Sequence, residues 1–150
     1  MITDFIKTIT SKERYKKIAR HLAKAGYQVE FDGKKVVGRS DIKKLRVVGG
    51  NNPLMFVFHE YEILPSVNKE ALDKAIQVAN NDFNPGKIKE EDGTLIVSVP
   101  IVNTRIKDTL TSIEVADYLL NTLIDSVLQE YKKQDSLYSL AETSVTKLPS

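Results

Sequence analysis

The stretch that decides the fold is LMFVFHEYEI, residues 54–63. Side chains alternate between two faces along a β-strand, and both faces are rich in large side chains here. One face holds Leu54, Phe56 and Phe58, and the other holds Met55, Val57, His59 and Tyr61. A strand that is apolar on both faces is predicted to lie in the centre of its sheet or to be covered on both sides.

Upstream of this stretch, the sequence predicts a hairpin and a third strand. Residues 27–31 alternate apolar and polar side chains, and Asp-Gly follows at positions 32 and 33. Both residues tolerate a positive φ, so they are typical of a two-residue hairpin turn. Counting outward from that turn pairs Val29 with Val36 and Glu30 with Lys35. A strand over about residues 42–48 follows, and the loop GGNNP leads into residue 54.

Downstream, a helix and a second hairpin are expected. The apolar residues of 67–82 recur with helical spacing and predict the helix, which Asn-Pro-Gly at 84–86 ends. Residues 87–91 and 94–99 then flank Asp92-Gly93, a second two-residue turn. Pro100 marks the end or the edge of the last strand.

Two further helices are predicted from capping boxes. Residues 2–9 suggest a short amphipathic turn, and Thr10–Glu13 then opens a helix that Gly26 ends. Thr111–Glu114 opens the longest helix, which is expected to reach about Lys133. Its apolar face is wider than one sheet layer needs, so it is expected to meet the sheet and a partner as well.

These elements predict an α+β fold in which helices pack on an antiparallel sheet of about five or six strands. Residues 1–134 form one domain, and the Ser- and Thr-rich residues 135–150 form a loosely held tail. With 41% hydrophobic residues the chain can build a core without cross-links to stabilise it. The absence of cysteine excludes disulfides and thiolate chemistry. No signal peptide and no apolar run near the ~20 residues of a membrane span are present, so a cytoplasmic protein is expected.

One part of the chain resembles a known family. Residues 79–88, ANNDFNPGKI, join an asparagine-rich helix end to a Gly-Lys-aliphatic strand. The features that follow it are the Asp92-Gly93 turn, the aliphatic strand over residues 95–99 and the helix from Ile113. This order resembles the fold shared by type III secretion chaperones and the YbjN-like proteins of bacteria, mainly over residues 60–133. The first half departs from it, since four strands are expected before the second helix where the simplest version has three.

The resemblance implies a modest set of functional expectations. Its members tend to be non-enzymatic and often dimeric, and the secretion chaperones hold extended segments of client proteins. The sequence therefore predicts a chaperone-like, protein-binding module whose partner is a second copy of itself or an extended client. Because a fold does not fix a function, the implication rests on analogy.

No catalytic, cofactor or metal site is predicted. His21 and His59 lack a second ligand at helical spacing, so both are expected to be surface or packed imidazoles. Four residues nearly match a calcium loop at its positions 1, 3, 5 and 12, and they are Asn80, Asp82, Asn84 and Glu91. That loop needs glycine at its sixth position, where Pro85 stands, so a helix end is expected instead.

Other chemical motifs are also incomplete. Residues 49–52, GGNN, lack the Lys-Ser/Thr of a phosphate-binding loop and precede a strand, so a plain turn is expected. No serine stands in a Gly-x-Ser-x-Gly elbow. The carboxylate pairs Glu60/Glu62 and Glu90/Glu91 are of a kind common in strands and turns, so a protein without enzymatic activity is expected.

The charge distribution supports an alternative function. The net charge is +2, yet residues 1–50 carry 13 Lys/Arg against 5 Asp/Glu, and residues 51–150 carry 9 against 15. If the basic side chains of the first half converge, they could bind the phosphate backbone of a nucleic acid. Few aromatic residues are interleaved with them, and Tyr15, Tyr27 and Phe31 are expected in the core. Binding to a nucleic acid is therefore the second hypothesis.

Overall fold

The computed structural model describes residues 14–82 and 86–145, with side chains as far as residue 137. The helices and strands follow the order α-β-β-β-β-α-β-β-α, which confirms the predicted α+β fold. Among the described residues, no helix has the length and apolar character that crossing a membrane requires. The predicted elements at residues 2–9 and 10–13 lie outside the described residues, as do positions 83–85.

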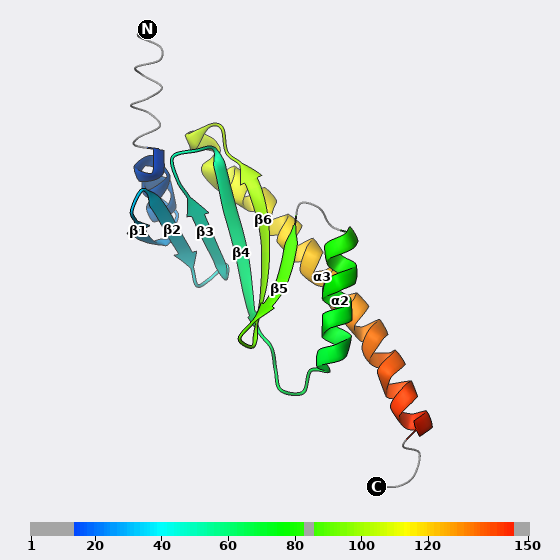
Figure 1. Ribbon diagram of the computed structural model, residues 1–150. Helices are drawn as coiled ribbons and strands as arrows, with labels where there is room; N and C mark the ends of the chain where they lie inside the picture. Colours follow the sequence, from blue (N-terminus) through cyan, green and yellow to red (C-terminus); the bar gives the residue numbers. More distant parts are fainter. Residues whose placement is uncertain (1–13, 83–85, 146–150) are drawn as a thin grey trace, which may run out of the picture.

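A single six-stranded antiparallel sheet forms the centre of the fold (Figure 1). The N-terminal helix is helical over residues 14–24. The elements after it are β1 (Gln28–Asp32), β2 (Lys35–Ser40), β3 (Leu45–Gly49), β4 (Leu54–Glu62), α2 (Lys69–Asp82), β5 (Lys87–Glu91), β6 (Thr94–Val102) and α3 (Thr109–Val145). The strand order is β1-β2-β3-β4-β6-β5, so the two nine-residue strands β4 and β6 lie together in the middle.

The first hairpin forms where it was predicted, but its register differs. Phe31 pairs with Val36 and Asp32 pairs with Lys35, so the turn consists of residues 33 and 34 rather than 32 and 33. Of the two turn residues, Gly33 alone has a positive φ, at 61°. A turn with a positive φ at its first central position is type II′, which needs glycine there. The predicted pairing of Val29 with Val36 is therefore wrong by two residues.

The second hairpin matches its prediction. Glu91 pairs with Thr94 across a turn of Asp92 and Gly93, whose φ angles are 51° and 77°. Positive φ at both central positions is the type I′ turn, which Asp-Gly favours. Pro100 lies inside β6 and is not its end, but β5 pairs no further than Ser98, so no described strand residue pairs with Pro100 on that side.

All three helices pack on the same face of the sheet. In Figure 1 the strands lie in front of α3, and α2 lies beside β5 along α3. The N-terminal helix sits on the β2 side, where Gly38 leaves room for Leu22: a Cβ added to that glycine would lie 2.8 Å from the Leu22 Cδ1. The core fills the space between sheet and helices, and its strand residues include Val36, Val47, Met55, Val57, Val97 and Val99.

The end of the N-terminal helix and the start of α2 each have a defined cap. Gly26 ends the N-terminal helix with φ at 91°, and the Tyr27 N–H donates to the Leu22 carbonyl, as a left-handed cap requires. The α2 helix begins at Lys69, two residues later than predicted, because the Asn68 side chain accepts a hydrogen bond from the Ala71 N–H and caps it.

The start and end of α3 were both predicted wrongly. A 3₁₀ turn at Ile106–Asp108 leads directly into the helix at Thr109, so the supposed capping box lies within the first turn. Asn103 and Thr109 are buried and bonded to each other, Nδ2 to Oγ1 at 2.8 Å, which fixes this entry. The helix continues past Lys133 to Val145, so the predicted tail is helical through residue 145.

Candidate functional site

The two faces of β4 have different environments. Met55, Val57 and His59 point toward the helices and are buried. Phe56 lies between them in the sequence, and 39% of its surface is exposed. The strand is central, as predicted, but helices of the described chain cover only one of its faces. We call the other face, formed by β1, β2, β3, β4, β6 and β5 together, the open face.

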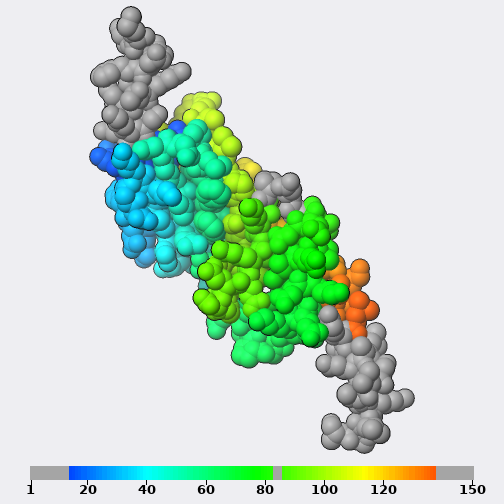
Figure 2. All heavy atoms as spheres, in the orientation of Figure 1, coloured from blue at the N-terminus to red at the C-terminus, as the bar shows by residue number. Residues whose placement is uncertain are grey.

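The strand register shows which side chains meet on the open face. Val37 pairs with Val48, which pairs with Phe56, which pairs with Pro100, so one apolar row crosses four strands. The next row consists of Arg39, Arg46, Phe58 and Ser98. Leu54, Val102 and Ile96 extend the apolar surface along β4 and β6. Figure 2, in the same view as Figure 1, shows strand atoms rather than a helix forming this surface.

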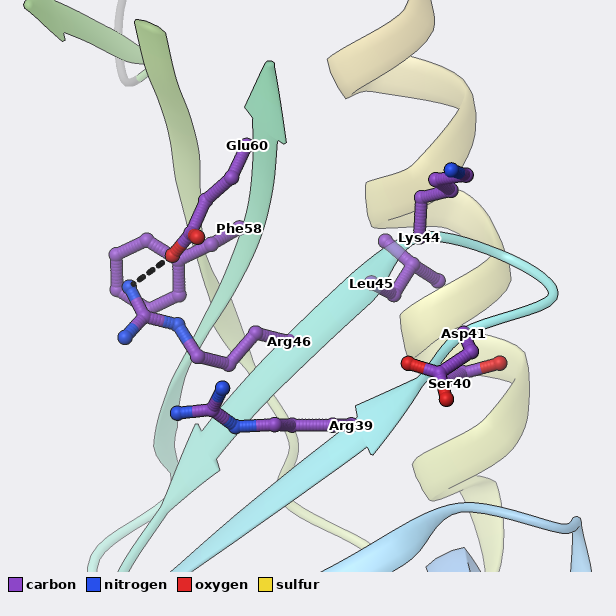
Figure 3. A pocket seen from close by; sticks show the side chains of 8 residues that line it. All are labelled: Arg39, Ser40, Asp41, Lys44, Leu45, Arg46, Phe58 and Glu60. Atoms are coloured by element: carbon purple, nitrogen blue, oxygen red, sulfur yellow. Dashed lines mark ion pairs between the residues drawn. The ribbon is translucent and has the colours of Figure 1, made fainter. Parts of the chain in front are cut away.

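A recess of about 400 Å³ lies at one end of the open face (Figure 3). The Arg46 guanidinium lies 4.5 Å above the Phe58 ring centre and 3.1 Å from the Glu60 carboxylate, Nη2 to Oε1. Arg39 stands directly opposite Arg46 in the register and points to the same side. Like charges placed directly opposite on one face destabilise a sheet, so this pair costs the free chain some stability.

The backbone groups of the two edge strands, β5 and β1, decide whether a partner could add a strand to the sheet. Along β5, the Asn80 side chain of α2 bonds both backbone groups of Ile88: its Nδ2 donates to the carbonyl at 2.9 Å, and its Oδ1 accepts from the N–H at 2.8 Å. These are the bonds that an added strand would make, so this edge is capped. The opposite edge, β1, is five residues long and carries Glu30 and Asp32.

His59 is part of a buried hydrogen-bond network. Its Nε2 lies 2.8 Å from the Asp117 Oδ1 on α3, and its Nδ1 lies 2.8 Å from the Tyr61 hydroxyl. A carboxylate accepts, so Nε2 donates to Asp117, and Nδ1 of the neutral ring accepts the Tyr61 proton. With both nitrogens occupied, the imidazole joins β4 to α3, as predicted for a packed histidine. His21 lies half-buried on the N-terminal helix.

The same carboxylate affects two tyrosines. Burial raises the pKa of Tyr61 above its ordinary value of 10.0, and the negative charges of Asp117 and Asp125 raise it further. Burial likewise raises the pKa of Tyr27, with smaller contributions from Asp117 and Glu114. Both hydroxyls therefore stay protonated where an exposed tyrosine begins to ionise.

A second hollow lies on the side of the helices. It measures about 310 Å³, and it is lined mainly by carbon atoms of β4, α2, β6 and α3, among them those of Ile63, Leu72, Leu95, Val127 and Leu128. The two tyrosine hydroxyls nearest it are already bonded, Tyr61 to His59 and Tyr131 to the Asn68 N–H. The hollow is therefore an apolar groove, and Glu62 is the charged residue in its lining.

The basic side chains that the structure describes between residues 14 and 50 do not converge on one surface. Lys16, Arg20 and Lys24 are exposed along the outer side of the N-terminal helix, which packs on the covered face of the sheet. Arg39 and Arg46 point instead to the open face. The basic residues are thus divided between opposite sides of the molecule.

The remaining sequence candidates have structural roles. The Asn80 oxygen is occupied by the Ile88 N–H, so it is not available as the first calcium ligand, and Asn84 lies outside the described residues. Within residues 14–82 and 86–137, no group of three or more His, Cys, Asp or Glu side chains could hold a metal ion. Gly49 ends β3, and the Asn52 side chain accepts from the Leu54 N–H at 2.9 Å, so residues 50–53 form a short connection into β4.

Three of the four carboxylates in the pairs Glu60/Glu62 and Glu90/Glu91 form ion pairs with basic side chains. Glu60 contacts Arg46, Glu90 lies 3.6 Å from Lys69, and Glu91 lies 3.2 Å from Lys89. Sequence reasoning missed Asp117, because its partner is 58 residues away and only the fold brings them together. It placed Phe56 and Phe58 on one face correctly but gave no sign that the described helices leave this face uncovered.

Comparison with known proteins adds no name to this description. No protein-family model matches the chain, and no curated protein matches it.

Proposed function

We propose that this chain is a non-enzymatic protein-binding module and that the open face of its sheet is the binding surface. The observation that carries the proposal is the apolar row Val37, Val48, Phe56 and Pro100, which no helix of the described chain covers. A contiguous apolar patch rimmed by polar side chains is typical of a surface that binds another protein. Phe56, at its centre, has the size and rigidity of an interface anchor.

The charges around the patch favour a polypeptide over a nucleic acid. Glu30, Glu60 and Glu62 share the open face with Arg39 and Arg46, so the rim carries both signs. A nucleic acid brings one negative charge with each nucleotide and would meet these carboxylates. An apolar centre with a rim of mixed charge is the usual composition of a protein–protein interface.

The face is also a better site than the edges. A client added as a strand needs free backbone groups, and Asn80 already occupies those of Ile88 on β5. The β1 edge is short and acidic, as guarded edges commonly are. The partner is therefore proposed to lie on the open face of the sheet rather than to extend one of its edges.

A peptide-display selection against the purified chain tests this proposal. Enriched peptides should bind the native chain and should lose binding to the Phe56→Glu variant, since a charge at the centre of the patch prevents an apolar contact. Leu137→Glu is the control, because Leu137 is 54% exposed on α3, which packs on the opposite face of the sheet. The absence of any enriched peptide, or peptides that bind the Phe56→Glu variant equally well, would refute the proposal.

Self-association is proposed to use a different surface, on α3. Val115, Tyr118 and Leu119 are 56%, 72% and 44% exposed and lie at helical spacings of three and four residues. Thr111 and Thr122 extend this stripe, which carries no charge. An uncharged stripe can pack against its own copy without repulsion between like charges, so a second copy of the chain is the partner proposed for it.

Light scattering over a range of concentrations tests this homodimer. The native chain should have twice the monomer mass, and Tyr118→Lys should be monomeric, because the twofold axis would bring two new charges together. Gln129→Lys, which is exposed on the same helix two turns beyond Thr122, should remain dimeric. A native chain that stays monomeric at every concentration would exclude the dimer. The proposal that the open face binds a polypeptide does not depend on this result.

A further inference from the structure

The recess beside Phe58 points to the chemistry of the partner. We infer that the open face binds a polypeptide segment with one carboxylate side chain, which lies between Arg39 and Arg46, and an apolar side chain two residues away, which lies on Val37 and Val48 beside Phe56. This inference rests on the proposed function, since it specifies the partner of the same surface.

The arginine pair is the first reason. Arg39 and Arg46 are directly opposite each other on neighbouring strands, and both project from the open face (Figure 3). Glu60 contacts Arg46 through a single 3.1 Å contact, and Arg39 takes part in no ion pair with the residues that the structure describes. Two guanidinium groups that repel each other across a sheet form a strong binding site for an anion, since each presents several donors in a fixed plane.

Arg46 is also incompletely bonded in the free chain. Its Nε–H is buried, and the described residues provide no acceptor for it. Its guanidinium rests on the Phe58 ring, which holds it in place at the mouth of the recess. A buried donor without a partner lowers stability, and proteins keep such costs mainly at functional sites.

The net charge of the recess matches one carboxylate. Its charged side chains are three cations, Arg39, Lys44 and Arg46, and two anions, Asp41 and Glu60. The sum is +1, which a single carboxylate neutralises. A phosphate chain would continue past the recess and place further charges on the apolar row beside it, where Val48 and Phe56 offer no hydrogen-bond donor from their side chains.

The register of the sheet sets the spacing of the predicted motif. Arg39 and Val37 lie two residues apart on β2, as do Arg46 and Val48 on β3, so the apolar row begins about 6.6 Å from the arginine pair. An extended polypeptide places side chains i and i+2 on one side with the same separation. The segment should therefore have an Asp or Glu and a large apolar residue separated by one residue.

The peptides enriched on the native chain test the inference. They should contain that spacing, and Arg39→Gln with Arg46→Gln should weaken their binding by about tenfold to a hundredfold, as the loss of charge-assisted hydrogen bonds predicts. The double variant should also select apolar peptides without the acidic residue. Lys87→Gln is the matched control, because Lys87 lies on the same row at the far side of the sheet and should leave affinity unchanged.

The possible failures are distinguishable. Apolar peptides without an acidic residue that still depend on Phe56 would overturn the carboxylate inference and leave the proposed function intact. No Phe56-dependent peptide would overturn both. A fluorescent oligodeoxythymidylate is the probe for nucleic-acid binding. If it binds the native chain more tightly than the peptides do, and if the arginine double variant loses that binding, the partner of the open face is a nucleic acid and not a polypeptide. Thermal melting of each variant shows whether it remains folded.

Discussion

The neighbouring residues Val47 and Val48 of β3 offer a matched test of the two faces. Val47 is fully buried against the helices, and Val48 lies half-buried in the apolar row of the open face. Threonine has nearly the same shape as valine and suits a strand, so the two substitutions to threonine differ mainly in where the new hydroxyl lies.

The magnitudes follow from the solvation of that hydroxyl. In Val47→Thr it is buried among carbon atoms without a partner, which should lower the free energy of unfolding by about 1–3 kcal/mol. The corresponding fall in Tm is roughly 2–12 °C for a domain of this length. In Val48→Thr the hydroxyl can reach water, so the change should stay within about 0.5 kcal/mol.

Urea unfolding at low protein concentration measures both variants under the same conditions. The midpoint should fall for Val47→Thr with an unchanged m-value, and it should barely move for Val48→Thr. Equal losses for the two variants would mean that Val48 is buried in the free protein, and the open face would then be part of a core. A loss for Val48→Thr that appears only at high concentration would identify a second copy on this face.

Three further outcomes follow from the packing. Asn80→Ala should lower the free energy of unfolding by about 1–3 kcal/mol and speed amide exchange at Ile88, and unchanged exchange there would contradict the edge cap. Gly38→Ala should cost about 1–3 kcal/mol because of the close leucine methyl, whereas Gly50→Ala, with no neighbour nearer than 3.8 Å, should change stability by less than about 1 kcal/mol. Because the folded chain raises the pKa of Tyr61, stability should be unaffected by its titration below about pH 10 and should fall as the pH rises further; Tyr61→Phe should reduce that fall, and an equal fall would refute the burial.

The sequence predicted local structure correctly at positions where the backbone conformation itself requires a particular residue type. Asp92-Gly93 supplies positive φ at two positions and gave the right hairpin, and Gly26 gave the right helix end. Asp32-Gly33 contains the same pair, but the type II′ turn needs only the glycine, so the strand keeps its aspartate and the register shifts. Turn type depends on the twist of both strands, which one dipeptide does not determine.

The candidate site could be predicted only in part. Alternation in β4 correctly separated Phe56 and Phe58 from His59, because strand geometry alone decides it. Which face of the sheet the helices cover depends on how elements distant in the sequence pack together. Because both faces of β4 are apolar, its sequence does not show which of them is covered. The Arg39–Arg46 pair could not be predicted either, because it depends on the register of β2 and β3. The two residues are seven apart in the sequence, and the residues of the turn between them do not indicate its type.

The central claim is that the open face binds a polypeptide, and backbone amide chemical shifts measured during titration with a selected peptide test it most directly. If the open face binds the peptide, the largest changes in amide chemical shift should lie at the open-face positions of β2, β3, β4 and β6. Val48, Phe56 and Phe58 should be at their centre. Shifts confined to the apolar groove between α2 and α3, or to the exposed stripe of α3, would contradict it.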